Sequence, residues 1–116
     1  MTELIALLGI GKGTWAEVAH LIKAQQWTKV YIITNDFGKD FRADNAEVHV
    51  ANFNKPTKQL RDDIYKMLQG KIKDLEVAVN ITSGTGREHM ALLAAILKLG
   101  VGVRLVTVEN NEFMDL

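Results

Sequence analysis

Residues 4–14, LIALLGIGKGT, decide the fold class that this sequence predicts. The run 4–8 is short, continuous and apolar, and it stops at a cluster of glycines. Such a run is typical of a strand with both faces buried, as in a parallel sheet covered by helices on both sides. The next segment carries an apolar helical face, spaced i, i+3, i+4 and i+7, formed by Trp15, Val18, Ala19 and Ile22. The opening stretch therefore predicts a strand, a glycine-rich turn and a helix.

The same alternation of strands and helices continues along the chain. Runs rich in β-branched and apolar residues predict further strands at 30–34, 47–50, 77–81 and 101–108. The residues after these strands form a short acidic tail.

Three helices are expected between the strands. The first runs from Thr14 to about Gln26, the second starts within 54–56 and stops at Gly70, and the third covers 90–99. Two segments have the spacing of capping boxes, namely Thr14 with Glu17 and Thr85 with Glu88, and Gly100 is a natural helix stop.

Five strands with three helices between them predict an α/β fold, a single Rossmann-like domain over residues 1–116. Right-handed crossovers favour a three-layer sandwich around a five-stranded, mainly parallel sheet in the order 3-2-1-4-5. The chain reverses direction between strands 1 and 4, and ligands bind such sheets where this reversal opens a crevice at the carboxyl ends of the strands. The loops beside that crevice are 9–14 and 80–87.

The composition excludes several classes of protein. The chain has no cysteine, which rules out disulfides and thiolate zinc sites and fits a reducing, cytoplasmic location. Fourteen basic residues balance fourteen acidic ones, so we expect no direct binding to duplex nucleic acid. The apolar run near the N-terminus is too short for a membrane span or a signal peptide. No His, Asp or Glu cluster has metal-ligand spacing, and we expect no metal site and no cofactor.

The two loops combine the groups that bind phosphate. Each leads into a helix N-terminus, which offers unpaired N–H groups and a partial positive charge. Glycine lets the backbone approach a ligand, and hydroxyls add donors. The candidate ligand-binding residues are Gly9, Gly11, Gly13, Asn80, Thr82, Ser83, Gly84, Thr85 and Gly86. Lys12, Thr14 and Arg87 also lie in these loops.

Each of these features also has a purely structural interpretation. The glycines can serve the turns, Thr14 and Thr85 can be helix caps, and Arg87 can be a solvated residue. His89 fits either the site or an exposed helix face. Asn80 could tie the two loops together by hydrogen bonds or contact the ligand.

Known nucleotide motifs match only in part. A P-loop needs Ser or Thr after its lysine, and Gly13 follows Lys12. The dinucleotide fingerprint G-x-G-x-x-G is nearly met from Gly9 on, but Thr14 stands at the third glycine. Asp36 follows the second strand where a ribose-binding acid would sit. An NAD-type nucleotide or dinucleotide module therefore stays an alternative.

The segment 80–90, NITSGTGREHM, resembles a motif of CARF domains, the CRISPR-associated Rossmann-fold sensors. In that family the fourth strand ends in Asn or Asp, a Thr/Ser-Gly-type turn follows, and a basic residue and often a Met come next. The loop 9–14 is similar to the family's other ligand loop. The resemblance covers the chain in element order and implies a stand-alone CARF domain without an effector domain.

The resemblance implies a function as well. Family members are typically homodimers whose paired sites bind cyclic oligoadenylate, and the apolar helix 90–99 would then pack against a partner. The chain would act as a sensor in CRISPR antiviral signalling or as a metal-independent ring nuclease, in which the ribose 2′-hydroxyl attacks the adjacent phosphate. Arg87 would face that phosphate, Lys12 and Thr14 would orient ribose and phosphate, and His89 would protonate the leaving 5′-oxygen. A regulatory dimerisation domain without this ligand is the remaining alternative.

Overall fold

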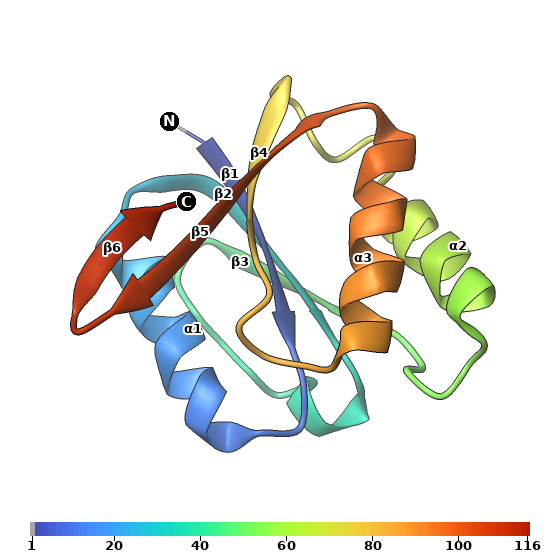
Figure 1. Cartoon of the computed structure of the whole chain (residues 1–116), viewed down its shortest axis with the longest axis horizontal. Helices are drawn as coiled ribbons and strands as arrows, with labels where there is room; N and C mark the ends of the chain where they lie inside the picture. Colours follow the sequence, from blue (N-terminus) through green and yellow to red (C-terminus); the bar gives the residue numbers. More distant parts are fainter. Residues whose placement is uncertain (1) are drawn as a thin grey trace.

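A computed structural model describes residues 2–116, with the side chain of Lys12 left out of the description. The elements follow one another as β1 (Thr2–Leu8), α1 (Lys12–Ala24), β2 (Trp27–Thr34), the 3₁₀ turn η1 (Asp36–Gly38), β3 (Ala46–Val50), α2 (Thr57–Leu68), β4 (Glu76–Asn80), α3 (Gly86–Leu99), β5 (Gly102–Glu109) and β6 (Glu112–Asp115). Strands and helices alternate up to β5, as the sequence predicts (Figure 1).

The described strands form one sheet in the order β3-β2-β1-β4-β5-β6. The first five of these strands are parallel, and β6 runs antiparallel to β5. β1 lies between β2 and β4, with Leu4 in register with Val30 on one side and Ala78 on the other. The predicted α/β fold and the order 3-2-1-4-5 are therefore confirmed.

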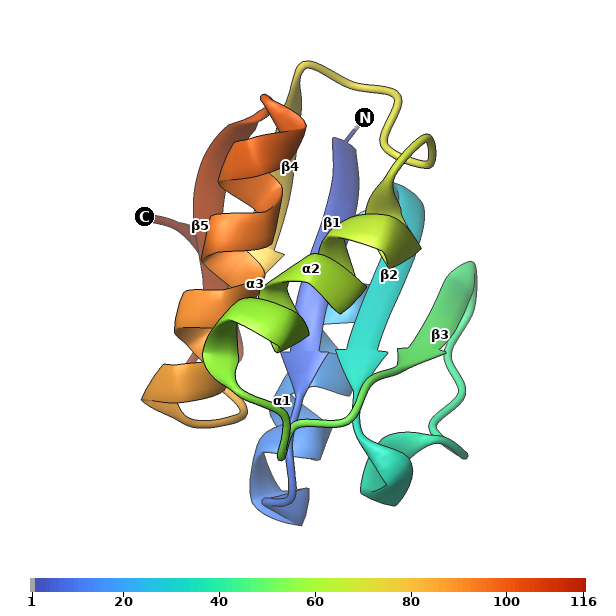
Figure 2. The same ribbon diagram turned by 90° about the vertical axis from the view of Figure 1, so that its right-hand side faces the viewer.

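Helices cover both faces of the sheet, which makes three layers (Figure 2). Even-numbered residues of β1, such as Leu4 and Leu8, pack in one apolar cluster with Val18 and Leu21 of α1. Odd-numbered residues of β1 pack in a second cluster with α2 and α3, for example Leu7. Both faces of β1 are buried, which is why residues 4–8 are apolar at every position instead of alternating.

The sheet has one strand more than the five predicted. The segment read as an acidic tail contains β6, which pairs with β5 through a tight hairpin. Asn110 and Asn111 form the turn, with φ of +53° and +62°. Two central residues with positive φ are the signature of a type I′ turn, whose twist suits a hairpin. The Asn-Asn pair was the signal for this strand.

The start of α1 also differs from the prediction. Gly11, and not Thr14, is the N-cap residue, and the helix begins at Lys12. The Thr14 hydroxyl donates to the Gly11 carbonyl, 2.6 Å away, from within the first turn. The expected capping box of Thr14 and Glu17 is therefore wrong, whereas that of Thr85 and Glu88 at the start of α3 is confirmed.

Candidate functional site

The two glycine-rich turns meet at the carboxyl edge of the sheet. The backbone N–H of Gly9 donates to Ser83 Oγ at 2.7 Å, across 74 residues of sequence. Thr14 Oγ1 lies 2.9 Å from the same Ser83 Oγ. Ser83 is only 1% exposed, so it holds the two turns together from the inside. Parallel strands that end at one edge bring these distant segments side by side (Figure 1).

Gly9 and Gly84 pack directly against each other. A Cβ atom on Gly9 would lie 2.8 Å from Gly84 Cα, so no larger residue fits without a shift of the backbone. Gly84 has a φ of +96°, and a Cβ atom there would collide with Leu7 Cδ2. At this point the turns touch, and Gly9 and Ser83 are buried. The exposed rim above the contact consists of Gly11, Gly13, Thr82, Gly84, Thr85 and Gly86.

Asn80 lies below the rim at the end of β4 and is 3% exposed. Its Nδ2 donates to the Val106 carbonyl at 2.9 Å and to Thr82 Oγ1 at 3.0 Å. Its Oδ1 accepts the Thr82 N–H at 3.3 Å. Asn80 therefore ties its own turn to β5, and the link between the two turns is made by Ser83 instead.

The first turn of α3 is closed by its own side chains. The Thr85 N–H donates to Glu88 Oε1 at 3.1 Å, and the Thr85 hydroxyl donates to the second carboxylate oxygen. His89 Nε2 lies 2.8 Å from the Ser83 carbonyl oxygen. Because a carbonyl only accepts, His89 Nε2 carries the proton in this contact. The half-buried His89 thus supports the turn from below.

The charged residue Arg87 does not point its donors at the two glycine turns. The Arg87 guanidinium donates to the carbonyls of Phe53 and Lys55, the latter at 2.6 Å, in the connection between β3 and α2. These bonds hold the start of α3 against the start of α2. The side chain of Lys12 lies outside the described part of the structure, and its backbone is the first residue of α1.

A hollow of ≈ 470 Å³ lies at the same edge, beside the first turn. It is bounded by the ends of β1, β2 and β3 and is lined by Ile10, Asn35, Asp36, Phe37, Val50, Ala51, Asn52, Phe53 and Asn54. Of these, sequence reasoning singled out only Asp36. Large apolar residues in polar loops at strand ends, such as Ile10 and Phe37, were the missed signal. A second hollow, of ≈ 650 Å³, lies beside the end of α1, where Lys23, Trp27 and Arg42 are among its lining residues, and neither glycine turn contributes to it.

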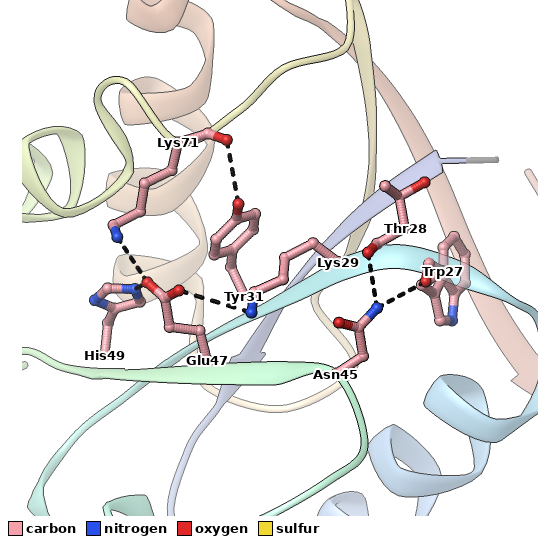
Figure 3. A network of polar contacts seen from close by, with 8 residues as sticks. All are labelled: Trp27, Thr28, Lys29, Tyr31, Asn45, Glu47, His49 and Lys71. Atoms are coloured by element: carbon pink, nitrogen blue, oxygen red, sulfur yellow. Dashed lines mark hydrogen bonds and ion pairs between the residues drawn. The ribbon is translucent and has the colours of Figure 1, made fainter.

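A network of charged groups surrounds Glu47 on β3 (Figure 3). Its carboxylate lies 2.8 Å from Lys71 Nζ, 2.7 Å from His49 Nε2 and 3.9 Å from Lys29 Nζ. The hydrogen bond from Lys71, reinforced by His49, lowers the pKa of Glu47 below its ordinary value. The Tyr31 hydroxyl donates to the Lys71 carbonyl at 3.1 Å, and burial raises the pKa of Tyr31. The network joins β2 and β3 to the connection after α2.

No protein-family model matches this chain, and no curated protein matches it in sequence. None of the described helices is long and apolar enough to cross a membrane. Among the described residues, no group of three or more His, Asp or Glu side chains could hold a metal ion. The strand order and the helices on both faces define a Rossmann-like α/β fold. The candidate site is the edge of its sheet where two helix N-termini adjoin.

Proposed function

We propose that this chain binds cyclic oligoadenylate as a CARF-type domain, at the edge where the two glycine turns meet. The observation that carries the proposal is the Gly9–Ser83 hydrogen bond, which joins turns 74 residues apart. It sets the N-termini of α1 and α3 next to each other, and both attract phosphate oxygens. The resemblance of segment 80–90 to the CARF motif supports the choice of ligand.

Backbone amides would make most of the contacts. The rim glycines are exposed, and their N–H groups would donate to the anion, whereas the Thr14 and Thr85 hydroxyls already donate to Gly11 and Glu88. Lys12, as the first residue of α1, adds a positive charge to this N-terminus. The ligand would therefore rest on helix dipoles and amides, in the manner of other phosphate sites.

Binding has more support here than cleavage. Ring opening would form a bond from the ribose 2′-oxygen to the adjacent phosphorus and break the bond from that phosphorus to the 5′-oxygen. The 2′-hydroxyl loses a proton and the leaving 5′-oxygen gains one. Arg87 and His89, the residues expected to assist, donate to backbone carbonyls. We therefore favour a sensor over a ring nuclease.

A second copy of the chain is the proposed partner. Met90 and Leu97 of α3 are 67% and 68% exposed, while Leu92 and Ile96 on the same helix are fully buried. The apolar character of α3 is thus only partly explained by the sheet and by α2. Two-fold pairing through this outer face would suit a ring ligand of even symmetry.

The experiment measures binding of cyclic tetra- and hexa-adenylate by calorimetry, with a chelator present. A Cβ atom on Gly13 meets nothing within 4 Å, so Gly13→Glu should fold, and its carboxylate would repel phosphate. We expect at least tenfold weaker binding for Gly13→Glu and a much smaller loss for the neutral Gly13→Gln. Failure of the wild type to bind either ring would reject the proposal.

Chromatography of the same mixtures separates the two versions of the function. Intact rings after prolonged incubation support a sensor. Products ending in a 2′,3′-cyclic phosphate identify a ring nuclease instead.

A nucleotide module of the NAD type is the second candidate, because Asp36 lines the hollow beside Ile10. Thermal stabilisation by NAD that is absent with oligoadenylate, and that is lost in Asp36→Ala, would favour it. A dimer that responds to neither ligand would favour a regulatory dimerisation domain.

A further inference from the structure

The hollow at the ends of β1, β2 and β3 lies outside the rim of the two turns. Its volume of ≈ 470 Å³ falls in the range of small-molecule sites. Three separate connections contribute to it, namely those that follow β1, β2 and β3. The hollow therefore lies on the carboxyl ends of β1, β2 and β3.

Large apolar side chains line the hollow and are left in contact with water. Ile10 is 63% exposed, Phe37 62% and Val50 44%, and they belong to three different connections or strand ends. Phe37 lies in the short turn η1, whose only buried residue is Gly38. A flat ring placed against Phe37 and Ile10 would remove apolar surface from water on both sides.

Polar groups in the same hollow have fixed orientations. Asn35 Oδ1 accepts the Phe37 N–H at 3.0 Å, and Asn52 Oδ1 accepts the Asn54 N–H at 3.0 Å. These bonds use the amide oxygens, so both amide nitrogens keep two N–H donors for a ligand. The Asp36 side chain is 89% exposed and supplies an acceptor, and its carboxylate lies 3.9 Å from Lys39 Nζ. Apolar walls with amide donors and one carboxylate match a nitrogen heterocycle better than a purely apolar ligand.

We infer that this hollow binds the base of an adenine nucleotide, with the ring against Phe37 and Ile10. Ile10 directly precedes Gly11, the N-cap residue of α1. A base in the hollow would thus leave its phosphate within reach of the α1 N-terminus. The inference rests on the proposed function for the identity of the ligand, and it adds a base site that the two turns do not contain.

The test uses adenosine 5′-monophosphate as the probe and measures its affinity by calorimetry. Stacking of a base on an aromatic ring is strong enough that Phe37→Ala should weaken binding about tenfold or more, while Phe37→Tyr should keep it. Leu75→Ala, which removes a 93% exposed side chain outside the hollow, is the control and should change nothing. Ribose 5-phosphate lacks the base, and its weaker binding should be the same in Phe37→Ala and in the wild type.

Failure of this inference is distinguishable from failure of the proposed function. Suppose that the wild type binds cyclic oligoadenylate, and that Phe37→Ala binds both this ligand and adenosine 5′-monophosphate as tightly as the wild type does. The base site is then rejected and the proposed function stands. If adenosine 5′-monophosphate binds in a Phe37-dependent way and the rings do not bind, the base site stands and the proposed ligand is rejected. Absence of adenosine 5′-monophosphate binding at millimolar concentration rejects the base site.

Discussion

Ser83 is the residue on which the contact between the two turns depends. It is the acceptor for the buried Gly9 N–H. Replacing it with alanine leaves that donor without its partner, and such a loss costs about 1–3 kcal/mol. We expect Ser83→Ala to lower the free energy of unfolding by this amount in urea titrations. Thr28→Ala, at an exposed position of β2, serves as the control and should lose far less.

Gly84 is required for two independent reasons, and a pair of variants separates them. Gly84→Ala places a side chain at a φ of +96° and against Leu7. Gly70→Ala meets a similar φ of +80°, but a Cβ atom there has nothing within 4 Å. Strain at positive φ costs about 1–2 kcal/mol in both. Gly84→Ala should therefore lose clearly more stability in the same titration, and equal losses would show that the contact with Leu7 contributes nothing.

At the scale of elements, helix starts are set by what their side chains find nearby. Thr85 caps α3 because Glu88 lies one turn further on and reaches back to it. Thr14 has a similar neighbour in sequence, Glu17, but its hydroxyl donates to the Gly11 carbonyl and lies beside Ser83. The same sequence pattern therefore produces a cap in one place and a link between turns in the other.

At the contact between β2, β3 and the connection after α2, Glu47 should make the stability of the fold depend on pH. Because the pKa of Glu47 is lowered in the folded state, its carboxylate stabilises the fold at pH values above the ordinary glutamate pKa of about 4.3. This contribution is lost as the pH falls through the lower pKa of the folded state. Because the side chain is 34% exposed, water screens the ion pairs, and we expect about 1 kcal/mol or less.

The measurement compares unfolding of the wild type and Glu47→Gln between pH 7 and pH 3. The wild type should be the more stable protein at pH 7, and the difference should shrink toward pH 3. Glu17→Gln, which changes an exposed carboxylate of α1, is the matched control. A difference that stays constant with pH would contradict the role of the carboxylate charge.

At the scale of the whole molecule, the outer face of α3 predicts self-association. We expect the wild type to form a dimer at micromolar concentration in light scattering. Leu97→Lys places a charge on this face, at a position that is 68% exposed, and should give a monomer with an unchanged fold. Leu75→Lys adds the same charge at a side chain that is 93% exposed in another part of the chain and should stay dimeric. A wild type that is monomeric throughout would contradict the proposed partner.

Much of the architecture follows from local pattern. The continuous apolar run 4–8 indicated a strand buried on both faces, and Leu4 and Leu7 do pack in the two different clusters. Gly100 indicated the end of α3, and its φ of +79° is the left-handed conformation that glycine permits. The strand that the sequence analysis did not predict, β6, follows a turn of two asparagines with positive φ, so its signal is local too.

The sequence predicted where the candidate site lies in the fold, but not which of its groups are exposed there. Apolar patterns, the glycines and the right-handed crossover rule were enough to predict the layers, the order of the first five strands and the edge at which two helix N-termini adjoin, because burial and turn conformation depend on residue type. Which groups at that edge face solvent was decided by tertiary structure alone. Ser83 has two partners on the other turn, and Arg87 has carbonyls of a third connection. A hydrogen bond depends on distance and direction between residues far apart in sequence, and these exist only once the three strand ends have come together.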